Sequence, residues 1–240
     1  SKQDGVFKIV EYINPKHVVV QFVETGNKVV GRIGNILCGQ IKDRMKPSVY
    51  GIGIVGEQVT VNGKRGRQYD IWVRMLDRCY SEKLAGYQAT YVDCTVSENF
   101  KYYPYFKEWC SKQVGFDQKD CNGRWFALDK DLLVKGNKIY SEDTCCFVPQ
   151  EVNNLLTNKK STRNTLPVGV EKTESGRFLA AFKKNRITTN LGRFDTSEEA
   201  FLAYKEAKEQ QIKVVTNRWK DQIDPKVYDA LMNWEVNITD

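Results

Sequence analysis

The chain has 240 residues, of which 41% are hydrophobic, so it is long enough for one large domain or for two to three small ones, each with a buried core. Its longest apolar runs are short, which predicts no transmembrane helix, and no signal-peptide pattern opens the sequence. The formal net charge is +7, and it is unevenly placed along the chain, which suggests a polyanionic partner more than general solubility.

The seven cysteines are an odd number and form no C-x-x-C pair. This usage disfavours a disulfide framework and indicates a reduced, cytoplasmic setting. A structural Zn²⁺ site built from Cys121, Cys145 and Cys146 is unlikely, because the spacing matches no standard zinc finger.

Residues 5–34 alternate apolar and polar side chains, with turn signals at Asn14-Pro15 and at Thr25-Gly26-Asn27, and residues 35–67 are rich in Gly, Lys and Arg. We therefore expect a small antiparallel β module over residues 1–67. The basic run from Asn62 to Arg67 predicts a turn at the end of this module.

Residues 68–160 combine helical and extended patterns. Apolar spacing predicts helices over 68–80, with Trp72 in the core, and near 103–112, with Tyr105, Phe106 and Trp109 facing inward. From Arg124 to Asn154 the pattern predicts a strand, a glycine-containing loop, a second strand and a helix. Acidic residues lie on the first strand and amides on the helix.

Residues 161–240 predict three short strands up to Phe194, followed by a helix that Asp195 or Thr196 caps. A tail helix starts at Pro225 and packs back onto the domain. Between residues 158 and 193 there are nine cationic and two anionic side chains. The net charge of this segment is therefore nine minus two, or +7, which equals the net charge of the whole chain. Such a local excess indicates nucleic-acid binding.

The segment GVEKTESGRFLAAFKKNRITTNLGRFDTSEEAFLAYKEAK resembles an AP2 domain over residues 167–212. The resemblance implies a three-stranded sheet packed on one helix, with the sheet lying in the major groove of double-stranded DNA. Upstream, IWVRMLDRCY and ALDKDLLVKGNKIYSEDTCCFVPQEVNN resemble phage proteins of the HNH-like, ββα-metal type, and ILCGQIKDRMKPSVYGIGIVG resembles the segment that precedes them there.

The expected fold class is therefore α+β, with three parts. These are an N-terminal small β module (1–67), a central HNH-like ββα-metal nuclease unit (68–160) and a C-terminal AP2-like sheet and helix with a helical tail (161–240). The resemblance implies a phage homing-type endonuclease that acts in the host bacterial cytoplasm and uses Mg²⁺ or Mn²⁺.

Phosphodiester hydrolysis needs a divalent metal, a base for water and stabilisation of the leaving oxygen. Mapped by the motif, Asp129 is a metal ligand and Asn153 or Asn154 is the ligand from the helix. Lys130 stands where the family has its histidine base, and between Asp129 and Asp131 it is a poor base, so we expect it to contact phosphate.

The missing base leaves three alternatives open, namely Asp131, Tyr140 or water activated by the metal alone. The one histidine, His17, is remote in sequence and is expected to be structural. A competing interpretation is that Asp129 and Asp131 only cap a turn and pair with Lys135 or Lys138, while Asn153 ties the hairpin together.

The expected DNA-binding residues are basic side chains of the AP2-like strands and of the segment before them. Arginine can bind guanine with two hydrogen bonds and lysine binds mostly phosphate. These residues are Arg177, Lys183, Lys184, Arg186 and Arg193 on the strands, and Lys159, Lys160 and Arg163 before them.

Two other functions remain open at this stage. The first is a non-catalytic DNA-binding protein, a regulator or an anti-defence factor, which the missing histidine favours. The second is a module that binds an acidic protein.

Overall fold

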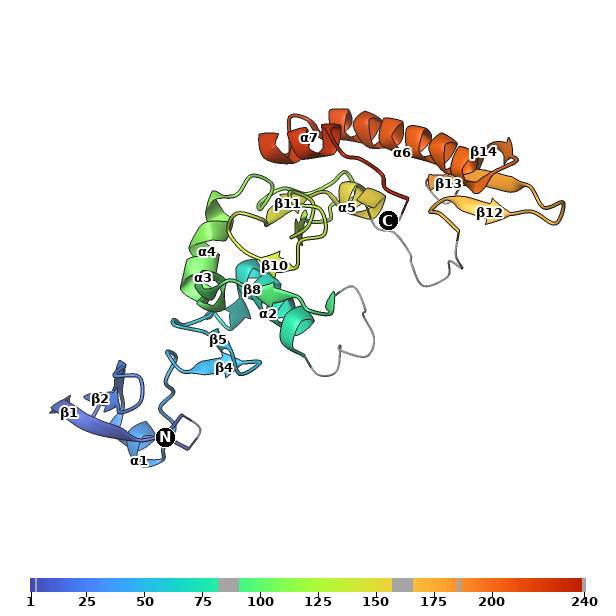
Figure 1. Ribbon diagram of the computed structural model, residues 1–240. Helices are drawn as coiled ribbons and strands as arrows, with labels where there is room; N and C mark the ends of the chain where they lie inside the picture. Colours follow the sequence, from blue (N-terminus) through green and yellow to red (C-terminus); the bar gives the residue numbers. More distant parts are fainter. Residues whose placement is uncertain (3, 82–90, 157–165, 185–186, 239–240) are drawn as a thin grey trace. The chain divides into compact units, whose positions relative to one another are not determined.

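The computed structural model describes residues 1–2, 4–81, 91–156, 166–184 and 187–238 (Figure 1). It divides into two compact units, each described here by itself. Unit 1 comprises Ser1–Ser111 and Lys138–Asp143, and unit 2 comprises Lys112–Asn137 and Thr144–Asp240.

Unit 1 begins with an antiparallel sheet of three strands in the order β1-β2-β3, in the segment where the sequence predicts antiparallel strands. The strands are β1 (Phe7–Asn14), β2 (His17–Phe22) and β3 (Lys28–Gly31). Because side chains alternate along a strand, Val18, Val20 and Phe22 share one face, and all three are buried. Ile36 of helix α1 (Ile33–Leu37) and Ile41 complete that core.

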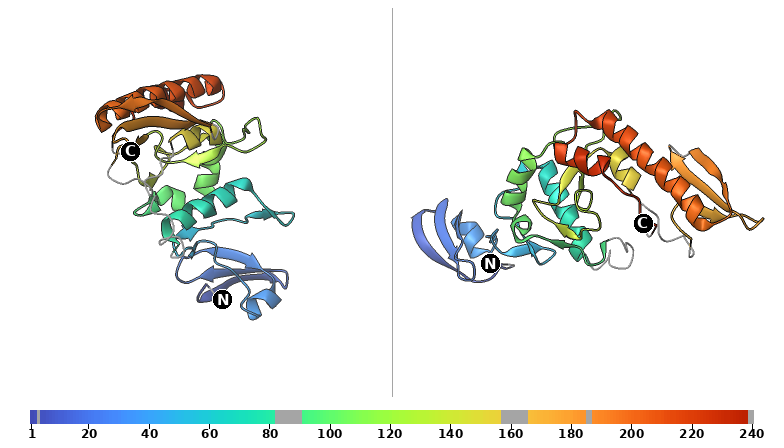
Figure 2. Two further views of the ribbon diagram at one scale, coloured as in Figure 1. Left: turned by 90° about the vertical axis from the view of Figure 1, so that its right-hand side faces the viewer. Right: turned by 45° about the horizontal axis from the view of Figure 1, so that its top comes forward.

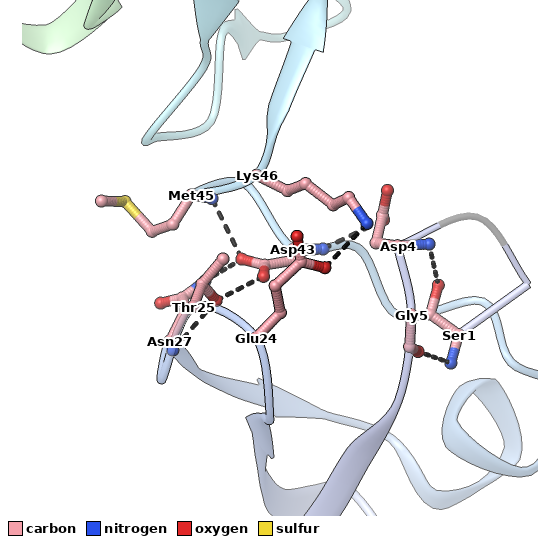
Figure 3. A network of polar contacts seen from close by, with 9 residues as sticks. All are labelled: Ser1, Asp4, Gly5, Glu24, Thr25, Asn27, Asp43, Met45 and Lys46. Atoms are coloured by element: carbon pink, nitrogen blue, oxygen red, sulfur yellow. Dashed lines mark hydrogen bonds and ion pairs between the residues drawn. The ribbon is translucent and has the colours of Figure 1, made fainter. Parts of the chain in front are cut away.

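A buried aspartate fixes the loops at one end of this sheet (Figure 3). The Asp43 carboxylate accepts hydrogen bonds from Thr25 Oγ1, from Asn27 Nδ2 at 2.8 Å and from the Met45 N–H at 3.0 Å. The Asp43 N–H in turn donates to the Asp4 carboxylate at 3.1 Å. The buried charge is thus compensated by hydrogen bonds, which burial of a carboxylate requires.

The rest of unit 1, where it is described, consists of short strands and helices. Its further elements are β4 (Pro47–Val49), β5 (Gly53–Ile54), β6 (Thr60–Val61), β7 (Lys64–Arg65), α2 (Arg67–Tyr80), β8 (Thr95–Val96), α3 (Glu98–Lys101), α4 (Tyr103–Lys112) and β10 (Ile139–Tyr140). The expected turn is the β6–β7 hairpin, in which Asn62 and Gly63 both have positive φ, as a tight two-residue turn requires.

The two helices expected from apolar spacing are confirmed as α2 and α4, with one correction. Trp72, Phe106 and Trp109 are buried as expected, but Tyr105 is 38% exposed and Tyr103 takes the inward position. Residues 103, 106 and 110 share one helical face, and residue 105 points away from it. The Tyr105 hydroxyl donates to Glu142 at 3.1 Å.

Unit 2 contains a short ββα arrangement. Strand β9 (Ala127–Asp129) pairs antiparallel with β11 (Cys146–Val148), and helix α5 (Gln150–Leu156) follows β11 directly. The strand that comes first after the glycine-containing loop, β10, pairs in parallel with β8 of unit 1 and is therefore not the partner of β9.

The remainder of unit 2 is a three-stranded antiparallel sheet packed on a long helix (Figure 1). Its elements are β12 (Val170–Lys172), β13 (Phe178–Lys184), β14 (Ile187–Phe194), α6 (Ser197–Trp219) and α7 (Pro225–Met232). Thr196 is the N-cap of α6 and forms a capping box with Glu199, which decides between the two expected caps. Gly169 has positive φ, and a Cβ there would lie 2.0 Å from the Tyr204 ring of α6.

These elements confirm the α+β class. The boundaries expected at residues 67/68 and 160/161, and the specific HNH-like and AP2-like modules, stay predictions. Within the described ranges no helix is both long and apolar enough to cross a membrane.

Candidate functional site

The candidate site lies at the end of β9, where the chain turns tightly. Asp129 Oδ1 accepts hydrogen bonds from the N–H groups of Asp131 at 3.0 Å and Leu132 at 2.9 Å. An aspartate that bonds to the backbone two and three residues ahead closes a turn by itself. Asp129 therefore does cap a turn, as the competing interpretation expects, and this uses one of its two carboxylate oxygens.

Asp131 lies close to Asp129 and changes its acidity. Burial, followed by the negative charge of Asp131, raises the pKa of Asp129 to about 6, although the two backbone N–H groups act in the opposite direction. The Asp131 side chain itself is 44% exposed. The end of β9 thus carries two adjacent carboxyl groups that repel each other, one partly buried and one open to solvent.

Lys130 is buried, with only 4% of its surface exposed. Its ammonium donates to Asp131 Oδ2 at 3.2 Å and to the Asn137 carbonyl at 3.1 Å, while Asn137 Nδ2 donates to the Lys130 carbonyl at 2.7 Å. These bonds close the loop from residue 130 to residue 137. The sequence predicts that Lys130 contacts phosphate. For this contact the ammonium would have to break its hydrogen bonds to Asp131 and to the Asn137 carbonyl.

The amides of α5 come from the helix that contacts β9. Asn153 is half-buried, and its N–H donates to the Pro149 carbonyl at 3.1 Å, which is an ordinary i to i−4 helical bond. Asn154 is exposed, and its Oδ1 accepts from Gln150 Nε2 at 2.9 Å. The structure thus brings the helix of the expected site against the strand that bears Asp129.

Tyr140 and His17, the other titratable groups considered for catalysis, both belong to unit 1. Tyr140 is buried, which raises the pKa of its phenol far above the ordinary value despite Arg78 nearby. The phenol therefore keeps its proton at neutral pH and is unsuited to accept one. His17 is exposed in β2, and its Nδ1 lies 3.2 Å from Asn14 Oδ1 across the β1–β2 turn.

The donor atoms at the end of β9 are oxygens, which Mg²⁺ and Mn²⁺ prefer. Mg²⁺ commonly takes one or two protein carboxylates and keeps several waters, so Asp129 and Asp131 fit such an ion. Among the described residues no group of three or more His, Cys, Asp or Glu could hold a metal. Cys146 is buried, which raises its thiol pKa well above the ordinary value.

One face of the sheet of unit 2 points away from α6 and carries Arg193. Across the three strands, Glu171, Leu179 and Arg193 lie side by side in one row. The neighbouring row contains Val170 and Ala180, and both are buried. Because alternate residues point to opposite faces, Arg193 points away from α6. Arg177 is held against β14 by Asp195, at 3.0 Å from its Nε, and by the Arg193 carbonyl, at 3.0 Å from its Nη2.

The remaining expected DNA contacts are only partly visible. The backbone of Lys183 and Lys184 lies in β13, opposite Thr188 and Ile187, and nothing is described of these two side chains. Four further residues lie outside the described residues, namely Lys159, Lys160, Arg163 and Arg186.

The sequence does not predict the polar contact between α5 and the end of α6, which we call the Glu151 clamp (Glu151, Arg218 and Trp219). Glu151 accepts from Arg218 Nη1 at 2.9 Å and from Trp219 Nε1 at 3.0 Å, and the Trp219 ring meets Phe126 edge-on at 5.7 Å. The first half of α6 packs on the β12–β14 sheet through Phe201 and Tyr204. Helix α6 thus carries the sheet at one end and the ββα arrangement at the other. The sequence signal for the Glu151 clamp is a tryptophan, Trp219, at the end of a helix.

Comparison of the chain with family models, with curated proteins and with solved structures finds no match.

Proposed function

We propose that the protein is a divalent-metal-dependent DNA endonuclease of the HNH-like, homing type, acting on double-stranded DNA and encoded by a phage. The observation that carries the proposal is the pair of adjacent carboxyl groups, Asp129 and Asp131, at the end of a strand that α5 contacts. A carboxyl group with a raised pKa beside a second carboxylate is a marker of functional sites.

In this proposal Asp129 holds the metal with the carboxylate oxygen that does not cap the turn, and Asn153 or Asn154 supplies a further oxygen from α5. The bound Mg²⁺ or Mn²⁺ would polarise the scissile phosphate and acidify water. Asp131, which is half-exposed, would accept the proton of the attacking water. Cleavage would leave 5′-phosphate and 3′-hydroxyl ends, as the resemblance implies.

The AP2-like sheet would bind the duplex in this proposal. The exposed Arg193 faces away from α6, and Arg177 lies beside it, so both can reach DNA that lies across the sheet. Because α6 links the sheet to α5 through Glu151, recognition and cleavage would be separated by a fixed length of helix.

The test is incubation of supercoiled plasmid with purified protein and Mg²⁺, Mn²⁺ or EDTA, beside the variants Asp129→Ala and Lys130→Ala. We expect metal-dependent nicking or linearisation that disappears in Asp129→Ala. The Lys130→Ala variant shows whether the buried lysine is needed for turnover.

The second candidate function is a DNA-binding protein without turnover, such as a regulator or an anti-defence factor. The observation that favours it is Lys130, a buried and hydrogen-bonded lysine at the position where the related nucleases carry their base. A clear mobility shift on varied DNA without any cleavage in Mg²⁺ or Mn²⁺ would support this function over the first.

A further inference from the structure

Strand β1 is an edge strand with unusual apolar exposure. Among the described residues, the order β1-β2-β3 gives β1 a neighbour on one side only, and Figure 2 shows it at the margin of the N-terminal sheet. Five large hydrophobic side chains on or beside it are exposed: Val6 (74%), Ile9 (53%), Val10 (41%), Tyr12 (60%) and Ile13 (62%). A long, apolar, unpaired edge is a site where another strand pairs.

The register of β1 against β2 fixes which way its side chains point. Phe7 is opposite Phe22 and Tyr12 is opposite Val18, so both lie on the face of the buried core residues. Lys8 is opposite Gln21 and Glu11 is opposite Val19, so both lie on the other face. In a regular strand, residues an odd number of positions apart lie on opposite faces. Here Lys8 and Glu11 share a face because the register shifts between Ile9 and Glu11, where Val10 is an extra residue.

This irregularity makes the strand complementary to itself. Opposite residues of an antiparallel pair must share a face, and in a two-fold pair each contact occurs twice. If the two-fold axis passes between Ile9 and Val10, Phe7 meets Tyr12 of the second copy. In the same register Lys8 meets Glu11 of the second copy. Within the part of the chain that the structure describes, no residue forms an ion pair with Lys8 or Glu11.

We infer that β1 is a dimerisation edge, at which two copies of this chain join their N-terminal sheets into one antiparallel sheet of six strands. Both the apolar pairs and the opposite charges match in a single register, which favours a second copy over an unrelated partner. Contacts within the chain already hold strand β1 in an ordered position, so that pairing does not have to order it. Asp43 bonds to the turn after β2 and to the segment before β1, and the Ser1 amino group bonds to the Gly5 carbonyl at 2.7 Å (Figure 3).

The test is sedimentation equilibrium of the full chain over a wide range of concentrations, at low salt. We expect the mass to rise from 27.7 kDa toward twice that value with concentration. Lys8→Glu replaces two attractive cross-strand pairs with two repulsive ones, so the dissociation constant should rise by roughly tenfold or more. The double variant Lys8→Glu with Glu11→Lys restores opposite charges in the same register and should restore association.

Leu37→Lys is the matched control, because Leu37 is also an exposed apolar residue but lies on α1, outside the strand. This variant should associate like the unchanged protein, and circular dichroism checks that each variant is folded. A protein that stays monomeric at every concentration would overturn the inference. So would a Lys8→Glu variant that dimerises as well as the unchanged protein, or a double variant no better than the single one.

Discussion

At the scale of single residues, the Asp129 side chain combines two properties, a hydrogen-bonding role in the turn and a partly buried negative charge. Its carboxylate caps the turn after β9 through two backbone N–H groups, which any oxygen acceptor could do. It also keeps a negative charge in a partly buried place next to Asp131, which the turn does not need. A group that destabilises the fold and has no structural need for its charge indicates a functional requirement.

The raised pKa has a defined effect on stability. An aspartate in an unfolded chain titrates near 4, whereas Asp129 titrates at about 6 in the folded protein. The folded state therefore loses stability as the pH rises from about 4 through about 6, and above that range ionised Asp129 costs roughly 1–3 kcal/mol.

Asp129→Asn should accordingly stabilise the protein at neutral pH when no metal is present. The amide keeps the oxygen that accepts from Asp131 and Leu132, and it removes the charge. We expect the free energy of unfolding to rise by about 1–2 kcal/mol at pH 7.5 and to change little at pH 4. Urea unfolding in EDTA at the two pH values measures this, and an equal loss of stability at both would show that the carboxylate is structural.

At the scale of elements, the Glu151 clamp sets how α5 is held by α6. Replacing Glu151 with Ala leaves the Trp219 Nε1–H without this acceptor in a largely buried place, which costs about 1–3 kcal/mol. Arg218→Ala removes only a half-exposed ion pair and should cost less than about 1 kcal/mol. Thermal unfolding of both variants tests the difference, and equal losses would contradict the role given to Trp219.

Much of this element structure could be predicted from the sequence, because it depends on local patterns. Alternation predicts strands over the β1–β3 segment, apolar spacing predicts α2 and α4, and a cap at Asp195 or Thr196 predicts the start of α6, which the structure assigns to Thr196. Local patterns do not determine pairing between distant segments. For this reason neither the β9–β11 pair nor the pairing of β10 with β8 follows from the sequence, nor does the extension of α6 to Trp219.

The candidate site shows the same limit. The acidic residues at the end of β9 and the amides of α5 were predicted as neighbours, and the two elements do contact each other. The burial of Lys130 could not be predicted, because it depends on the Asn137 carbonyl that the loop brings back to its ammonium. Whether these residues bind a metal stays a prediction.

At the scale of the whole molecule, the local excess of cations predicts that DNA binding weakens steeply with salt. Each phosphate contact to duplex DNA contributes about 0.9 to the slope of log affinity against log salt. Arg193→Ala should weaken binding by about tenfold and, if Arg193 contacts a phosphate, lower that slope by about one. Fluorescence anisotropy with a labelled duplex at several salt concentrations measures both.

Lys226→Ala is the matched control for this experiment, because Lys226 is an exposed cation on α7, away from the β12–β14 sheet. It should leave both the affinity and the slope nearly unchanged. Equal effects of the two substitutions would mean that the net charge, and not the sheet, binds DNA.

The central claim is tested most directly by plasmid cleavage in Mg²⁺ or Mn²⁺ with the unchanged protein and Asp129→Asn. This variant is the sharpest one, since it preserves the turn after β9 and is expected to be the more stable protein, so a loss of activity cannot come from unfolding. We expect metal-dependent cleavage by the unchanged protein. Cleavage by Asp129→Asn should be slower by about a hundredfold or more, which is on the order of the loss of one catalytic group. Cleavage at the same rate by both proteins would contradict it.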